Sequence, residues 1–226
     1  MPEYSKANLH GELSYAPITF FGEKLKIGVI GAGRGALIKV RNFYNKGSKI
    51  EVLALDFLED FYNFNKDKVK LIKGNYNKEF ILDKHLIIIA IDDENIIHKI
   101  KNDCEKLYKI YINSSKFKEG MGVIPVSRES EFITVAVNTK VGNPRGSIMV
   151  ADSITESLQG FDEYIKLTGK IRNDLTLDKE IRDNLLKFIN SSDCKFFYDK
   201  NKILQVFKLF YNDDIVSKIR SLRKED

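Results

Sequence analysis

Three small residues with the spacing Gly31-x-Gly33-x-x-Ala36 form a candidate phosphate-binding loop. In such a loop the first glycine allows a tight turn, the second lets a pyrophosphate approach the main chain, and a small third residue lets the following helix pack closely on the strand. The apolar run 26–30 predicts a strand before the loop, and apolar residues at helical spacing predict a helix after it. Because a helix N-terminus offers free N–H groups to phosphates, this context predicts a dinucleotide site. A glycine-rich turn without a ligand is the alternative interpretation.

Carboxylates follow two of the other expected strands, and each could contact a bound dinucleotide. Asp56 ends the run 50–55, where a carboxylate can accept a hydrogen bond from the ribose 2′-hydroxyl, which favours NAD over NADP. Asp92 and Asp93 end the run 86–91. Since ligands of open α/β sheets bind outside the carboxyl ends of the strands, this pair is predicted to face the nicotinamide half of the site. The alternative is that the pair caps the next helix.

The elements that must position these residues alternate along the first half of the chain. Apolar runs predict strands at 26–30, 50–55, 69–72, 86–91, 109–112 and 132–137. Helical patterns between several of them are typical of a parallel sheet with helical crossovers. The predicted fold class is therefore α/β, with a Rossmann-type parallel sheet. We expect a Rossmann domain over 1–112, a linker region over 113–147 that completes the sheet, and a helical domain over 148–226.

The composition is that of an ordinary globular protein. The chain has 226 residues, 43% of them apolar and 31% charged, and a formal net charge of +5. The cationic residues are scattered rather than gathered into a stripe, which argues against a nucleic-acid partner. No apolar run reaches the ~20 residues of a membrane-spanning helix, and the polar start of the chain is unlike a secretory signal. We therefore expect a cytoplasmic protein without a membrane segment.

No set of metal ligands is predicted from the histidines and cysteines. His10, His85 and His98 lie far apart in the sequence. Cys104 and Cys194 form no CxxC motif, and two cysteines without a signal are typical of free thiols in a reducing compartment.

Several segments, taken together and in order, resemble the precorrin-2 dehydrogenase family. The resemblance rests on KIGVIGAGRGALIKVRNFYNKGSKIEVLALDF at 26–57 and on IIIAIDDENI at 87–96. Shorter matches lie at 15–18, 112–113, 123–125, 137–144 and 161–175. The family includes the N-terminal part of multifunctional siroheme synthases and stand-alone dehydrogenase/ferrochelatase enzymes.

The resemblance implies an enzyme that uses NAD to oxidise precorrin-2 to sirohydrochlorin in siroheme or cobalamin biosynthesis, and some such enzymes also insert Fe²⁺. It further implies a homodimer, with the region 113–147 contributing to dimerisation, and a tetrapyrrole cleft between domains. Two alternatives stay open. One is a chelatase or tetrapyrrole-binding protein without dehydrogenase activity, and the other is an NAD(H)-sensing regulatory module.

The resemblance also implies which residues form the site. Beside the coenzyme, together with the loop residues and the Asp92–Asp93 pair, it places Arg34, Gly35, Leu55 and Asp56. The segments that match the family near the tetrapyrrole contain Asn113, Thr139, Lys140 and Asn143, and Arg145 follows directly after one of them. Because the tetrapyrrole carries many carboxylates, cationic side chains are expected near it, and the further candidates are Lys39, Arg41 and Arg128.

One departure from the family pattern concerns the catalytic residue. The family usually has an aspartate three residues after the asparagine of the fourth long strand, and that aspartate is credited with roles in dehydrogenation and chelation. In this chain the corresponding sequence is Asn113-Ser114-Ser115-Lys116. The catalytic residue is therefore unknown from the sequence, and Asp93 and Glu119 are the candidates for a substitute general base.

Overall fold

The computed structural model describes residues 14–158 and 160–224. The chain forms two compact units, of which one is Tyr15–Ile124 and the other contains Pro125–Asp226. We call Tyr15–Ile124 the sheet unit and the chain from Pro125 onward the C-terminal unit.

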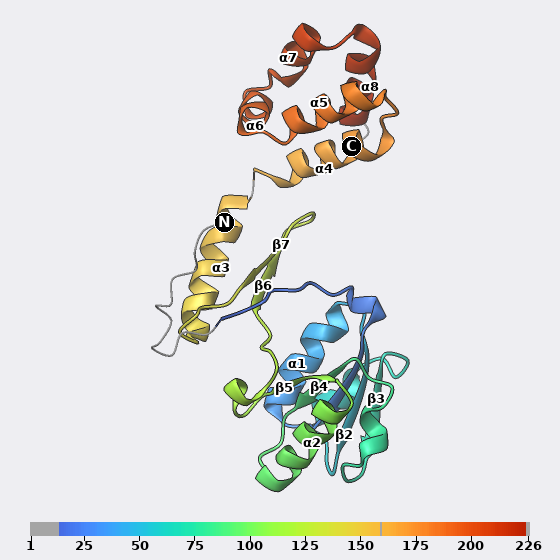
Figure 1. Cartoon of the computed structure of the whole chain (residues 1–226), viewed down its shortest axis with the longest axis vertical. Helices are drawn as coiled ribbons and strands as arrows, with labels where there is room; N and C mark the ends of the chain where they lie inside the picture. The colour runs from blue at the N-terminus through green and yellow to red at the C-terminus, as the bar shows by residue number, and fades with distance from the viewer. Residues whose placement is uncertain (1–13, 159, 225–226) are drawn as a thin grey trace. The chain divides into compact units, whose positions relative to one another are not determined.

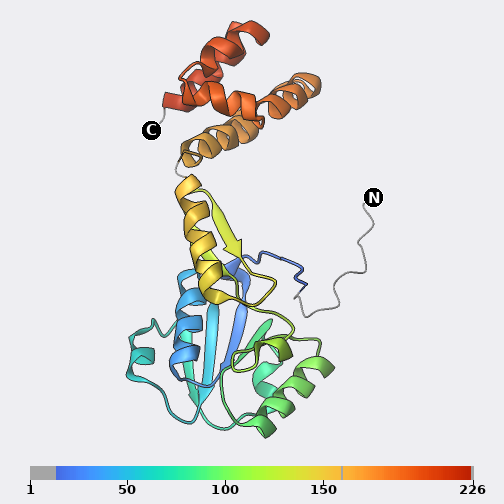
Figure 2. The same ribbon diagram turned by 90° about the vertical axis from the view of Figure 1, so that its left-hand side faces the viewer.

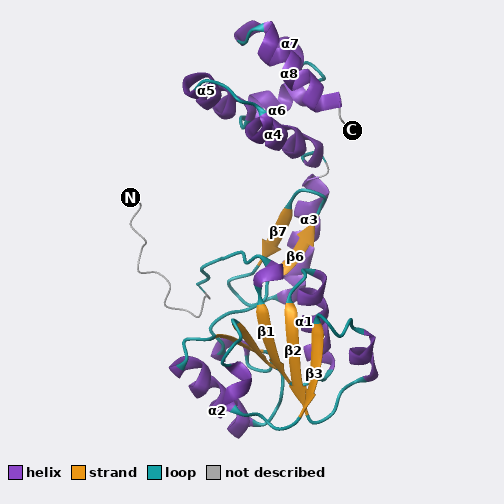
Figure 3. Ribbon diagram, turned by 90° about the vertical axis from the view of Figure 1, so that its right-hand side faces the viewer, coloured by secondary structure: helices purple, strands orange, loops and turns teal. Residues whose placement is uncertain are grey.

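Within the described residues, the sheet unit is built on one five-stranded parallel sheet in the order β3-β2-β1-β4-β5 (Figure 1). The strands are β1 (Lys26–Ile30), β2 (Lys49–Ala54), β3 (Val69–Lys73), β4 (Leu86–Ile89) and β5 (Ile110–Asn113). Figure 3 shows β1, β2 and β3 side by side. The α/β fold class and the five corresponding strand predictions are confirmed.

Both faces of the sheet are covered, which explains why its strands are almost continuously apolar. Ile27 and Val29 lie in the core under α1 (Arg34–Asn45), whereas Ile30 lies in the core under α2 (Glu94–Lys106). Figure 2 shows α1 in blue and α2 in green on either side of the strands. Successive side chains of a strand point to opposite faces, so one apolar run contributes to both cores. The other connections contain short 3-10 turns, η2 (Glu59–Asn63) and η3 (Lys78–Ile81).

The sheet unit ends at Ile124, further along the chain than the boundary expected at residue 112. After β5 the chain forms the 3-10 turn η4 (Phe117–Glu119), and the N–H of Met121 donates to the carbonyl of Tyr111 at 2.9 Å. Ile124 packs against the core under α1. The segment after β5 therefore belongs to the sheet unit, because its main chain and an apolar side chain are bound there.

The prediction that 113–147 completes the sheet is wrong. The expected strand at 132–137 is β7 (Thr134–Val137), and it pairs antiparallel with β6 (Val126–Glu129) in a separate two-stranded sheet. A parallel strand needs a crossover of a dozen or more residues, whereas the short turn between β6 and β7 allows only a hairpin. The N–H of Ser130 closes this turn on the carbonyl of Ile133 at 2.9 Å.

Helices make up the rest of the C-terminal unit, as the apolar pattern predicts. Helix α3 begins at Pro144, packs against β6 and β7, and ends at Leu158. A second apolar core joins α4 (Asp162–Asp174), α5 (Lys179–Ile189), α6 (Ser192–Asp199), α7 (Ile203–Phe210) and α8 (Asp213–Lys224). None of the helices in the described part of the chain has the length and apolar character needed to span a membrane.

Candidate functional site

The glycine loop lies between β1 and α1, and its glycines serve different purposes. Gly31 has φ +104°, and a Cβ added to it would lie 2.2 Å from the carbonyl oxygen of Ala90. By contrast, a Cβ added to Gly33 or Gly35 would meet nothing within 4 Å. Gly31 is therefore required by the fold, whereas Gly33 and Gly35 leave open space above the main chain. Such bare main chain is what the pyrophosphate of a dinucleotide needs.

The N-terminus of α1 is open toward this space. Gly33 is the N-cap, and no side chain within residues 14–158 and 160–224 caps the helix. The first hydrogen bond of the helix runs from the N–H of Leu37 to the carbonyl of Gly33 at 3.0 Å. The N–H groups of Arg34, Gly35 and Ala36 precede it and have no acceptor within the helix. Ala36 is 1% exposed, so its methyl group packs α1 against the sheet while its N–H stays at the open end.

The loop lies where the strand order of the sheet reverses. β1 is flanked by β2 on one side and by β4 on the other, and these two strands continue the sheet in opposite directions. Ligands of doubly wound sheets bind in the crevice at such a switch point, outside the carboxyl ends of the strands. Leu55 and Asp56 follow β2 at this end of the sheet, and both are exposed. The Oδ1 atom of Asp56 lies 3.1 Å from the Nζ of Lys73.

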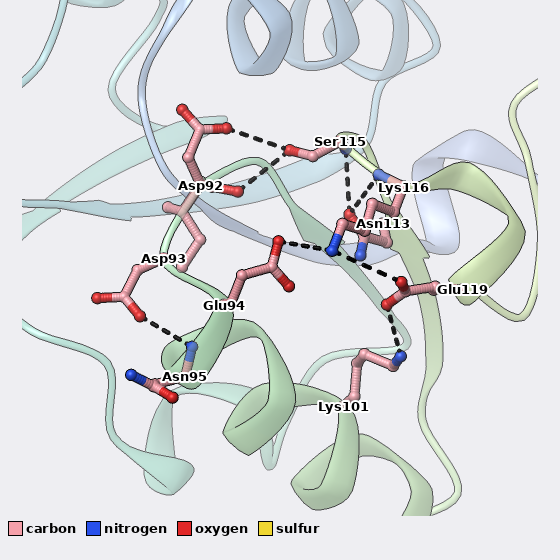
Figure 4. A network of polar contacts seen from close by, with 10 residues as sticks. Asp92, Asp93, Glu94, Asn95, Lys101, Asn113, Ser115, Lys116 and Glu119 are labelled. Carbon is pink, nitrogen blue, oxygen red and sulfur yellow. Dashed lines mark hydrogen bonds and ion pairs between the residues drawn. The ribbon is translucent and has the colours of Figure 1, made fainter.

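Of the acidic pair after β4, Asp93 is a helix cap. Its Oδ1 accepts a hydrogen bond from the N–H of Asn95 at 3.0 Å (Figure 4). It accepts another from the N–H of Ile96 at 3.1 Å, also at the start of α2. The capping alternative therefore describes Asp93. Asp92 is exposed, and in the part of the chain that the structure describes its Oδ1 has one long contact, of 3.4 Å, with the hydroxyl of Ser115, which also donates to the carbonyl of Ile91 at 3.1 Å. The two neighbouring carboxylates thus differ in how strongly the protein holds them.

Glu119, the other candidate base, belongs to a network of ion pairs. Its Oε2 accepts from the Nζ of Lys101 at 2.9 Å, and its Oε1 lies 3.9 Å from the Nζ of Lys116 (Figure 4). Lys116 also pairs with Glu94 at 2.7 Å. The hydrogen bond from Lys101 lowers the pKa of Glu119 below its ordinary value, and the hydrogen bond to Glu94 raises the pKa of Lys116. A carboxylate with a lowered pKa is a weaker proton acceptor.

This network has a consequence for stability that can be measured. Because the folded-state pKa of Glu119 is lowered, its stabilising effect is present above the ordinary value of 4.5 and is lost as the pH falls below it. We expect Glu119→Gln to lower the Tm slightly at pH 7, and the difference from the unmodified chain to vanish on acidification below pH 4.5.

Thermal unfolding followed by circular dichroism at several pH values measures this effect. Glu131→Gln is the matched control, because Glu131 is exposed and has no ion pair among the described residues. A Tm difference for Glu119→Gln that persists unchanged in acid would contradict the expectation.

Asn113, expected beside the substrate, holds the turn after β5 instead. It is fully buried, and its Oδ1 accepts from the N–H groups of Ser115 and Lys116, both at 3.1 Å. Among the described residues, the Asn113 Nδ2 and the Ser114 Oγ are buried without a hydrogen-bond partner. In the sheet unit the Asn113 side chain therefore positions Ser115 and Lys116 rather than lying open to a ligand.

The other expected substrate residues lie in the C-terminal unit. The hydroxyl of Thr139 accepts from the N–H of Asn143 at 2.7 Å, and the Asn143 side chain accepts from the N–H of Gly146 at 3.0 Å. These two residues shape the loop that starts α3. Lys140 and Arg145, beside them in the sequence, are exposed. The structure thus presents two cations on a loop held by two polar side chains.

The further cationic candidates form ion pairs or a hydrogen bond with residues of their own units. Arg41 pairs with Asp60 at 2.5 Å, and Arg128 pairs with Asp152 at 2.6 Å. Partial burial lowers the pKa of Lys39, whose Nζ donates to the carbonyl of Gly35 at 3.4 Å.

The described histidines and cysteines do not form a cluster that could hold a metal ion. His85 accepts from the N–H of Lys26 at 3.1 Å, and His98 is exposed on α2, while His10 lies outside the described residues. Cys104 and Cys194 are buried free thiols, and burial raises the pKa of Cys104 to about 12. No group of three or more His, Cys, Asp or Glu that could hold a metal ion occurs in the described ranges.

Sequence reasoning missed Lys73, Lys101 and Glu94 as neighbours of the candidate site. Lys73 is recognisable only as a cation at the end of a strand, and its contact with Asp56 depends on the pairing of β3 with β2. The ion pairs of Lys101 and Glu94 depend on how the segment after β5 folds against α2.

Known proteins share sequence and fold with this chain. Residues 21–126 match the family of putative NAD(P)-binding domains. Siroheme synthases from Psychrobacter cryohalolentis and Psychrobacter arcticus are 30% and 28% identical to the chain over 162 residues, which is 70% of its length. The chain spans only about a third of these relatives, 31% and 29% of their lengths.

The fold is also found in a solved structure of SirC, a precorrin-2 dehydrogenase. The similarity covers 87% of this chain and 100% of that one, with a TM-score of 0.67 and 18% sequence identity. At this identity the similarity establishes the fold. The resemblance noted in the sequence is thus confirmed as a similarity: the chain is similar to siroheme synthases over 162 residues, and its residues 21–126 match the family of putative NAD(P)-binding domains.

Proposed function

We propose that the chain binds NAD at the glycine loop and uses it to oxidise precorrin-2 to sirohydrochlorin in tetrapyrrole biosynthesis. The observation that carries the proposal is the open main chain at Gly33 and Gly35, next to an uncapped helix N-terminus at the switch point of the sheet. The similarity to siroheme synthases and to a precorrin-2 dehydrogenase supports the choice of substrate.

Different residues of the sheet unit bind different parts of the coenzyme. The main-chain N–H groups of Arg34, Gly35 and Ala36 hold the pyrophosphate, because they have no acceptor within the helix. The carboxylate of Asp56 accepts a hydrogen bond from the ribose 2′-hydroxyl. NAD, when bound, supplies the hydride acceptor. The protein must orient the substrate and accept a proton.

Asp92 is the carboxylate that we assign to proton transfer. Asp93 is used as a helix cap and Glu119 is held by ion pairs, whereas Asp92 is exposed at the end of β4 with one long contact to Ser115. A weakly held carboxylate at the switch point can accept a proton without breaking a structural interaction. The hydroxyl of Ser115 donates at 3.1 Å to the carbonyl of Ile91, and so holds the main chain next to Asp92.

The prediction for Asp92 concerns turnover rather than coenzyme binding. We expect Asp92→Asn to lower kcat about a hundredfold, the usual contribution of a general base, and to leave the Kd for NAD unchanged. Stopped-flow measurement of NADH formation and calorimetric titration with NAD test the two halves. The matched control is Asp93→Asn, which should retain kcat and keep the helix cap, because an asparagine Oδ1 accepts the same N–H groups. Equal kcat for Asp92→Asn and the unmodified chain would remove Asp92 from the mechanism.

The activity itself is tested with the purified chain, NAD and precorrin-2. The expected result is NADH absorbance together with the sirohydrochlorin spectrum, and no reaction without NAD. A folded chain that binds both ligands without turnover would overturn the dehydrogenase proposal.

One observation favours a second candidate, a chelatase or tetrapyrrole-binding protein without dehydrogenase activity. Lys116, paired with Glu94, stands where the family usually has an aspartate. In that case sirohydrochlorin binding, or insertion of Fe²⁺ as a substrate, would proceed equally well without NAD.

The proposal includes a homodimer formed through the hairpin β6–β7 and α3. Val141 and Met149, in the loop before α3 and on α3 itself, are 75% and 69% exposed. Apolar side chains exposed on one small element favour burial against a second copy. A solution mass of twice the chain mass by light scattering is the expected result, and a monomer would contradict it.

A further inference from the structure

Lys73 lies beside the carboxylate to which the proposed function assigns the ribose. It is the last residue of β3, and in the parallel pairing it stands opposite Ala54, the last residue of β2. The N–H of Gly74 donates to the carbonyl of Ala54 at 3.0 Å, so the ends of the two strands are joined. Asp56 follows closely after Ala54, and this arrangement places its Oδ1 3.1 Å from the Nζ of Lys73.

The ion pair between Lys73 and Asp56 is available to a ligand. The two side chains are 73% and 90% exposed, so neither contributes to the core. Exposed ion pairs contribute little to stability, because solvent and salt screen them. The pair can therefore exchange partners without a cost to the fold.

We propose that Lys73 determines coenzyme specificity by binding the 2′-phosphate of NADP, so that the chain accepts NADP as well as NAD. This inference rests on the proposed coenzyme site. A carboxylate after β2 accepts the free 2′-hydroxyl of NAD and repels a 2′-phosphate. The ammonium group of Lys73, at ion-pair distance from Asp56, offsets that repulsion and binds phosphate as a point charge.

The two residues then serve different coenzymes. With NAD, Asp56 accepts the 2′-hydroxyl and keeps Lys73 as its counter-ion. With NADP, the ammonium group turns to the phosphate, which its 73% exposure permits. Discrimination between the coenzymes is thereby weaker than Asp56 alone would give.

The same strand offers a matched control. Lys70 is also exposed, at 67%, and also pairs with a carboxylate of β2, since its Nζ lies 3.8 Å from Glu51. Glu51 lies within β2, away from the strand end at which the ribose is expected. Lys70→Met therefore removes an equally exposed cation of β3 without touching the proposed ribose site.

The experiment measures Kd for NAD and NADP by calorimetry, using the full chain. We expect the unmodified chain to bind both within about tenfold, and Lys73→Met to weaken NADP about tenfold while NAD stays nearly unchanged, the effect of losing one charge-assisted contact. Lys70→Met should change neither value. Asp56→Asn should shift the preference toward NADP, and adding Lys73→Met should remove that shift.

The outcomes separate this inference from the proposed function. A chain that binds NAD but not NADP, or a Lys73→Met variant with an unchanged ratio of the two Kd values, overturns the role of Lys73 and leaves the proposed function standing. A chain that does not bind NAD overturns both. Circular dichroism is expected to show that each variant is folded, since the side chains of Lys70 and Lys73 are 67% and 73% exposed.

Discussion

Gly33→Val is expected to abolish NAD binding while leaving the fold intact. Gly33 has φ −82° and ψ −175°, an extended conformation that any residue adopts, and an added Cβ would meet nothing within 4 Å. The valine side chain would instead fill the open space above the main chain, where the pyrophosphate must approach. We expect a loss of affinity of at least about a thousandfold, equivalent to about 4 kcal/mol.

Calorimetry with NAD and thermal unfolding, performed on the same preparation, measure both halves of this prediction. Ile38→Val is a suitable control, because it changes a side chain of α1 that is 68% exposed and lies outside the loop. Retained NAD affinity in Gly33→Val, with an unchanged Tm, would mean that the loop is a structural turn without a ligand.

Gly31→Val is expected to have the opposite profile, a loss of the folded sheet unit. The φ of +104° excludes a β-branched side chain, and the added Cβ would lie 2.2 Å from the carbonyl oxygen of Ala90. Neither β1 nor the end of β4 can shift without breaking sheet hydrogen bonds. The combined strain is about 4 kcal/mol or more, a large part of the ~5–15 kcal/mol that stabilises a typical domain.

Urea unfolding of the full chain, followed by circular dichroism, measures this loss. Gly35→Ala is the control within the same loop, because its Cβ meets nothing and alanine favours the helix by about 0.5–1 kcal/mol over glycine. A Gly31→Val variant as stable as the unmodified chain would show that the turn can relax. The close contact with Ala90 would then not exclude a side chain at position 31.

Gly31 and Gly33 also show which features of the loop can be predicted from the sequence. Their spacing predicts a strand, a turn and a helix, because turn conformation and helix initiation depend on neighbouring residues. The assignment of different roles needs the structure, since the atom that excludes a side chain at Gly31 belongs to Ala90, directly after β4 and far along the chain.

For the strands, too, the sequence predicts the element but not its partner. Runs such as 86–91 are recognisable as strands because a β-strand buried on both faces is apolar throughout. The residues of a strand do not by themselves predict which strand it pairs with. Thus the apolar run 132–137 predicts a strand correctly, but this strand, β7, pairs with β6 rather than with the parallel sheet, because its pairing depends on the short turn after β6.

The parallel α/β architecture, the glycine loop and the position of Asp56 after β2 can be predicted from the residues alone, because these features depend on short-range periodicity and turn chemistry. That Asp93 caps α2, that Lys116 and Lys101 pair with Glu119, and that Lys73 contacts Asp56 is visible only in the folded chain. The physical reason is that Coulomb attraction and hydrogen bonding act over a few ångströms. Which charges come that close is settled by the pairing of strands and the packing of distant segments, rather than by spacing along the chain.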